Sequence, residues 1–69
     1  MISPEIIGTR IKNRREELGM SREIFCQAVG ITPSAASMYE TGQRVPRDEI
    51  KINIARTLKT TIEALFFAE

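Results

Sequence analysis

The sequence predicts an all-α protein, a compact bundle of five short helices. Apolar residues recur at helical spacing along most of the chain, no segment alternates convincingly with period two, and residues that start or stop helices divide the chain into short segments. With 69 residues, of which 42% are hydrophobic and 28% charged, the chain has the composition of a globular protein, and we expect one domain over residues 1–69.

The first helix is predicted to follow Ser3 and to end at Gly19. Serine is a favoured cap, and Pro4 suits the first helical position, where its missing N–H costs nothing. The predicted inward row, which Arg14 interrupts, consists of Ile7, Ile11 and Leu18. The basic residues of this helix are Arg10, Lys12, Arg14 and Arg15. Since the net charge of the chain is only +1, we interpret this cluster as a solvated helix face.

The second and third helices are predicted on either side of a turn at Gly30, a residue that can adopt a positive φ. Ser21 can cap the second helix, and Thr32 followed by Pro33 can start the third, which stops near Gly42. The inward residues of the second helix are Phe25, Cys26 and Val29. On a helical wheel, the inner side of the third helix consists of Ala36, Tyr39 and Glu40, and the outer side of Ser34, Ser37, Met38 and Thr41.

A fourth and a fifth helix are predicted after the loop that ends at Pro46. Acidic residues follow this proline, as is typical of a helix start, and the apolar residues of the fourth helix are Ile50, Ile54, Ala55 and Leu58. Thr60 or Thr61 can cap a short fifth helix. Its inward residues are Ile62, Leu65 and Phe66, which leaves Ala64 and Phe67 away from the core.

The composition excludes several kinds of site. The chain has no histidine and one cysteine, which leaves no plausible zinc set, and we expect neither a metal nor a cofactor. Without a Gly-rich phosphate loop or a nucleophile with a recognisable partner, an enzyme is not predicted, and Cys26 on its apolar stripe is interpreted as a core residue. No run approaches the ~20 apolar residues of a membrane span, so we expect a cytoplasmic protein, and no small-molecule ligand is evident.

The segments Ser21–Val29 and Pro33–Glu40, joined through Gly30, have the helix-turn-helix pattern. In that motif the second helix enters the major groove of double-stranded DNA, and the preceding helix lies across the sugar-phosphate backbone. The same pattern also occurs as mere packing. Spacing alone therefore favours DNA binding and packing about equally.

Several stretches in order carry a resemblance to one family. They are IGTRIKNRREELGMS, F-C-x-x-V-G-I-T, S-x-Y-E-x-G with the later Pro46, and I-x-x-L-F. From Ile7 to Phe66 the chain resembles the Cro and C1 repressor type of helix-turn-helix domain, also called the Xre family. The resemblance implies a lambda repressor-like DNA-binding domain and a transcriptional regulator that occupies an operator and excludes or recruits polymerase.

Position by position, the resemblance also implies the site residues. Base contacts are expected from Pro33, Ser34, Ser37 and Met38. Phosphate contacts are expected from Arg10, Ser21, Arg22, Thr41, Gln43 and Arg44. Arg15 and Glu40 match a pair that forms a salt bridge between the first helix and the end of the recognition helix. The alternative is two exposed charges worth less than ~1 kcal/mol to each other.

The chain departs from the family pattern in three ways. Arg22 stands where the family usually has glutamine, and it adds a charge suited to a phosphate. The outer face of the recognition helix lacks the Arg, Lys, Asn and Gln side chains that read guanine or adenine bidentately, so serine hydroxyls, methyl contacts, Gln43 and Arg44 or DNA shape must supply specificity. Ala36 replaces a larger aliphatic residue, and either Met38 or Phe25 can fill the resulting gap. If Met38 fills it, Met38 belongs to the core and not to the site.

With so few specific donors in one chain, useful affinity requires two copies on a two-fold DNA site. We therefore expect a homodimer, with the C-terminal segment including Phe67 as its surface, although terminal fraying also explains an exposed Phe67. The alternative function is a protein-interaction module of the same fold, such as an antitoxin or an accessory factor. The uncharged outer face of the third helix supports that alternative.

Overall fold

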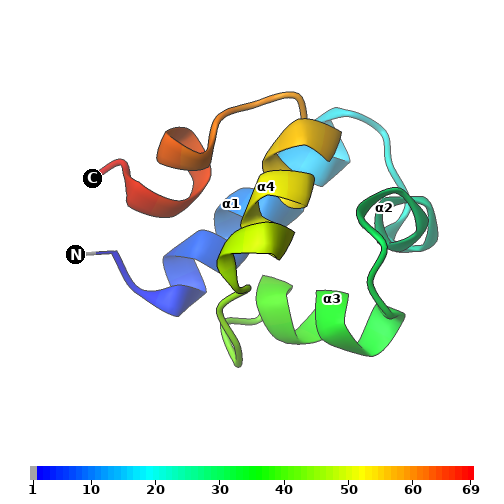
Figure 1. Ribbon diagram of the computed structural model, residues 1–69, viewed down its shortest axis with the longest axis horizontal. Coiled ribbons are helices and arrows are strands. Elements are labelled where there is room, and N and C mark those ends of the chain that lie inside the picture. The colour runs from blue at the N-terminus through cyan, green and yellow to red at the C-terminus, as the bar shows by residue number, and fades with distance from the viewer. Residues whose placement is uncertain (1) are drawn as a thin grey trace.

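This computed structural model describes residues 2–69, which contain four α-helices and a C-terminal π-helical turn (Figure 1). The helices are α1 (Pro4–Glu17), α2 (Arg22–Val29), α3 (Pro33–Glu40) and α4 (Asp48–Thr57), and the turn is η1 (Glu63–Phe67). This order confirms the predicted all-α class with five helical elements. Only the fifth element differs in kind, because its residues wind as a π-helix.

Side-chain hydroxyl groups cap the N-terminal ends of most of these elements, as predicted. The Oγ atom of Ser3 accepts a hydrogen bond from the N–H of Ile6 at 3.2 Å, and the hydroxyl oxygens of Ser21, Thr32 and Thr61 accept equivalent bonds. Between α2 and α3, Gly30 has a φ of 86°, the left-handed conformation expected of this turn. Helix α4 begins at Asp48, and its capping residue Arg47 makes no side-chain capping bond.

The core lies where the inward faces of the helices meet. Its buried apolar residues are Ile7, Ile11, Phe25, Cys26, Val29, Ala36, Tyr39, Ile54, Ala55, Leu58, Leu65 and Phe66. All of them belong to the inward rows that the sequence predicts. Leu18, Ile50 and Ile62, which are also in those rows, are partly buried and pack against this cluster.

Helix α1 approaches the end of α3 so closely that one residue of α1 has to be glycine. A Cβ atom added to Gly8 would lie 2.5 Å from the backbone oxygens of both Tyr39 and Glu40, and backbone atoms cannot move aside as a flexible side chain can. Gly8 is buried within α1. The close approach of the two helices therefore depends on this missing side chain.

Replacing Gly8 with alanine is expected to lower the free energy of unfolding by about 1 to 3 kcal/mol, the usual cost of overpacking. At an exposed helical glycine, replacement by alanine raises the free energy of unfolding instead, because alanine favours a helix by about 1 kcal/mol relative to glycine. Thr9→Ala, at an exposed position one residue along α1, is the matched control and should stay within about 0.5 kcal/mol of the wild type. Urea unfolding measures both changes. A Gly8→Ala variant more stable than the wild type would contradict the close approach.

Two arginines of the basic cluster hold the C-terminal segment onto α1. Arg14 Nε donates to the carbonyl oxygen of Leu58 at 2.9 Å, and its Nη2 donates to that of Lys59 at 3.3 Å. Arg10 Nη1 donates to the carbonyl oxygen of Ala64 at 3.1 Å. The interpretation of this cluster as a solvated helix face is wrong for these two residues. Arg14 interrupts the apolar row because its guanidinium binds the free carbonyls at the end of α4.

Candidate nucleic-acid interface

Helix α3 lies along one edge of the molecule, with α1 and α4 on its inner side and α2 beside its N-terminal end (Figure 1). Its inner residues Ala36, Tyr39 and Glu40 are buried. On the outer side Ser34 is exposed, and Ser37 and Met38 are partly exposed. Met38 also lies outside the core cluster of the described residues, so the gap beside Ala36 is not filled by Met38.

A buried ion-pair network connects the three N-terminal helices at Glu40. Arg15 of α1 donates from Nε to Glu40 Oε2 at 2.8 Å and from Nη2 to Oε1 at 3.3 Å, while its Nη1 donates to the carbonyl oxygen of Met20 at 2.8 Å. The side chains of Arg15 and Glu40 are only 9% and 1% exposed, so they are not the exposed pair of the alternative interpretation. The hydrogen bond to Glu40 is the main cause of a raised Arg15 pKa.

Arg22, at the start of α2, also binds Glu40, a contact that the sequence did not indicate. Its Nη2 atom donates to Glu40 Oε1 at 3.2 Å, and 46% of its side chain is exposed. One edge of this guanidinium is therefore held by protein, and its other N–H groups remain open to solvent. Ser21 precedes it as the exposed cap of α2.

The segment that follows α3 brings together three of the predicted phosphate-binding residues. Thr41 Oγ1 donates to the carbonyl oxygen of Ser37 at 2.8 Å and accepts from Gln43 Nε2 at 3.0 Å. The Thr41 hydroxyl proton is therefore already engaged in a hydrogen bond within the protein, whereas Gln43 has a second amide N–H that can donate to a ligand. Within residues 2–69, no hydrogen bond or ion pair engages the exposed guanidinium of Arg44.

Arg10 is not brought together with these residues. Its guanidinium binds the backbone of η1, at the end of the molecule opposite α2 (Figure 1). The structure thus divides the predicted phosphate contacts into a group around α2 and α3 and one residue, Arg10, that serves the C-terminal segment. The contacts with DNA themselves remain predictions.

Cys26 lies in the core behind this surface and is 3% exposed. Burial is the main cause of its raised pKa, and the charge of Glu40 raises it further. The usual thiol value is 9.0, and a higher pKa in the folded state means that folding favours the protonated thiol. Its contribution to stability is complete below the pKa of the unfolded chain and is lost as pH rises through the folded-state pKa.

We therefore expect the free energy of unfolding to fall more steeply above about pH 9 in the wild type than in Cys26→Ser, which has no thiolate to form. Urea unfolding at a series of pH values from 7 to 10.5 measures the difference between the two slopes. All other side chains are the same in the two proteins, so their contributions cancel in this comparison. Parallel slopes would contradict a raised thiol pKa.

Two short helices joined through a left-handed glycine, with the second helix at the surface, define a helix-turn-helix domain. A helix-turn-helix family model, HTH_3, matches residues 11–65. The chain belongs to this family, the Cro/C1-type helix-turn-helix proteins, which are DNA-binding regulators of transcription. A search of curated proteins found no match. No helix in the described residues is long and apolar enough to cross a membrane.

Three solved structures have the same fold. The P22 c2 repressor in complex with synthetic operator 9T superimposes with a TM-score of 0.88 at 23% identity, covering 93% of this chain and 97% of that one. The clp gene regulator ClgR from C. glutamicum gives a TM-score of 0.83 at 17% identity, covering 94% and 84%. ComR from S. thermophilus, in its apo form, gives 0.82 at 32% identity, covering 90% of this chain but only 21% of ComR.

Proposed function

We propose that this chain is a sequence-specific regulator of transcription that reads the major groove of double-stranded DNA with α3 and represses by occupying an operator. The observation that carries the proposal is the exposed outer side of α3 in a Cro/C1-type domain, with the unpaired Arg44 after its end and the half-exposed Arg22 beside it. The P22 c2 repressor, which shares this fold, was solved in complex with an operator. An enzyme has no support from any of these observations.

Some of the proposed contacts supply affinity for DNA, and the others select its base sequence. Arg44, Arg22, Ser21 and Gln43 contact phosphates, which supply affinity without sequence information. Pro33, Ser34, Ser37 and Met38 contact base edges. Thr41 is left out of the proposed phosphate contacts, because its hydroxyl and its backbone N–H both donate to the carbonyl oxygen of Ser37. Arg10 is left out of the proposed interface, because its guanidinium binds the carbonyl oxygen of Ala64.

We also propose that two copies bind one two-fold site, with half-sites about 34 Å apart. The proposed dimer surface surrounds Phe67, which is 56% exposed. Two hollows of about 300 and 350 Å³ lie against this ring, lined mainly by apolar side chains such as Ile52 and Ile62 in one and Ile2 and Val45 in the other. A projecting ring and a hollow on the same face allow each copy to insert into its partner, as a two-fold interface requires.

Arg44→Ala is expected to weaken binding to every DNA sequence alike, whereas Ser34→Ala is expected to change which sequence is preferred. The measurement is the apparent dissociation constant as a function of salt, with an operator selected from a random pool and with a random duplex. In the wild type, the logarithm of affinity should fall steeply with the logarithm of salt concentration, and Arg44→Ala should reduce this slope by about 1.

Arg56→Ala is the matched control for lost charge, because Arg56 is exposed in the last turn of α4 and is not one of the proposed DNA contacts. It should leave the salt slope at its wild-type value. A flat salt response, or no binding at low salt, would show that α3 does not meet DNA. That result would favour the protein-interaction module, which the uncharged outer side of α3 also suits.

A further inference from the structure

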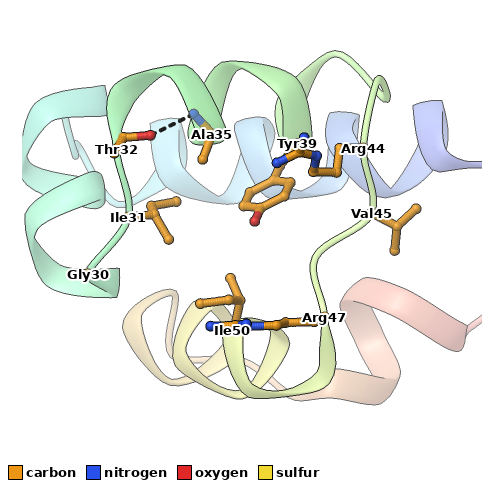
Figure 2. A pocket seen from close by; sticks show the side chains of 9 residues that line it. All are labelled: Gly30, Ile31, Thr32, Ala35, Tyr39, Arg44, Val45, Arg47 and Ile50. Carbon is orange, nitrogen blue, oxygen red and sulfur yellow. Dashed lines mark hydrogen bonds between the residues drawn. The ribbon is translucent and has the colours of Figure 1, made fainter.

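A cavity of about 400 Å³ that is wide open to solvent lies between α3 and α4, beside the turn at Gly30 (Figure 2). Its volume falls within the range of pockets that hold small molecules, about 300 to 1,000 Å³. The apolar part of its lining consists of Ile31, Ala35, Val45 and Ile50. Ile31 lies in the turn before α3, Ala35 in α3, Val45 in the segment after α3, and Ile50 in α4. The cavity therefore forms only when these segments pack together in the folded chain.

Three polar side chains line the same cavity from opposite sides. Tyr39 is only 7% exposed, yet its hydroxyl points from α3 toward α4 into the cavity (Figure 2). Arg44 lies on the side of α3 and Arg47 on the side of α4 (Figure 2). In the described part of the chain, no side chain or carbonyl group binds the Tyr39 hydroxyl or either guanidinium. A solvent-accessible hydroxyl and two exposed cations thus line one space without a partner among the described residues.

This combination selects one class of ligand. Two guanidinium groups and a phenolic O–H are hydrogen-bond donors suited to an anionic oxygen, and no acidic side chain lines the cavity to repel it. The aliphatic residues around them favour a compact apolar group. We infer that the cavity is a binding site for a small organic carboxylate whose apolar body packs on Ile31, Val45 and Ile50 and whose carboxylate is bound by Tyr39, Arg44 and Arg47.

The site has a regulatory consequence, which rests on the proposed function. Arg44 is one of the proposed phosphate contacts, and one guanidinium cannot serve a carboxylate inside the cavity and a DNA phosphate outside it with full strength. Bound ligand therefore competes with DNA. The carboxylate acts as an effector that releases the protein from its operator.

Binding to the free protein is tested first, by two-dimensional ¹H–¹⁵N NMR titration. The probes are benzoate, benzyl alcohol, which has the same ring without the charge, and inorganic phosphate, which has the charge without the ring. Benzoate is expected to shift the amide signals around the cavity, at Ile31, Ala35 and Val45, and to bind about tenfold more tightly than either other probe. Equal binding of benzyl alcohol or of phosphate would overturn the ligand class.

Variants then test the donors. Tyr39→Phe removes only the hydroxyl and keeps the buried ring, and Arg47→Ala removes a cation outside the proposed DNA contacts. Each should weaken benzoate binding about tenfold. Arg56→Ala, on the same helix as the cavity residue Ile50 but outside the lining, should bind benzoate as the wild type does. The proposed site would be overturned if benzoate shifted no amide signals around the cavity. It would also be overturned if Tyr39→Phe and Arg47→Ala bound benzoate as tightly as Arg56→Ala does.

Competition is measured separately, as the DNA affinity of the wild type with benzoate or with chloride at the same ionic strength. Benzoate should raise the apparent dissociation constant for DNA, and Arg47→Ala should require about tenfold more benzoate for the same effect. Benzoate binding without any change in DNA affinity would overturn the competition and leave the site standing. If the protein bound no DNA at all, the proposed function would fail, while the NMR titration would still decide whether the cavity binds a carboxylate.

Discussion

Replacing Glu40 with alanine is expected to lower the free energy of unfolding by about 3 to 5 kcal/mol, the cost of leaving a buried charge without its partner. The stranded charge is Arg15, whose side chain is 9% exposed and which stays ionised at any accessible pH. Its remaining bond to the carbonyl oxygen of Met20 satisfies one N–H group and offsets part of the loss. For a domain of this size, the melting temperature should fall by about 12 °C or more.

Two further variants separate a stranded charge from a simple loss of contacts. Arg15→Met removes the buried cation and strands Glu40, although Arg22 still neutralises it in part, so its loss should be smaller than that of Glu40→Ala. The double variant Arg15→Met/Glu40→Met replaces the pair by apolar groups of similar volume, a change that is often neutral or stabilising. It should therefore be more stable than Glu40→Ala. A double variant less stable than either single change would mean that packing, not charge, explains the effect. Urea and thermal unfolding measure all three.

The helices could be predicted from the sequence because their boundaries are set by local chemistry. Ser3, Ser21 and Thr32 cap helices with their own hydroxyl groups, and Gly30 takes a positive φ that few other residues tolerate. The inward rows follow from helical spacing alone. Such signals lie within a few residues of one another, so one sequence is enough to identify them.

Contacts between distant segments could not be predicted in the same way. Gly8 is required by the backbone of α3, and nothing near Gly8 in the sequence indicates this neighbour. Arg14 binds Leu58, 44 residues away, and Arg10 binds Ala64, 54 residues away, where the sequence suggested a solvated face or a phosphate contact. The Arg15–Glu40 pair was expected only from the family resemblance. The second arginine on Glu40, Arg22, and the cavity beside Tyr39 required the three-dimensional structure.

Replacing Phe67 with glutamate is expected to raise the dissociation constant of the proposed homodimer by about 100-fold or more. Each dimer loses two buried aromatic rings, and burial of one such side chain contributes about 1.5 to 3 kcal/mol. The isolated chain should stay folded, because Phe67 lies outside the core. Its ring lies 5.3 Å from Lys51 Nζ, so this ammonium group is close enough to meet the new carboxylate. Sedimentation equilibrium measures the change.

The control is Ile24→Glu, which introduces the same charge at an apolar side chain of similar exposure, 55%, on α2 and away from both hollows. It should dimerise as the wild type does. DNA binding then links the dimer to function: Phe67→Glu should lose affinity for a two-fold operator but bind an isolated half-site with wild-type affinity, because the half-site meets only one α3. Equal losses on both kinds of site would mean that Phe67 supports the DNA-binding surface itself and that the dimer forms elsewhere or not at all.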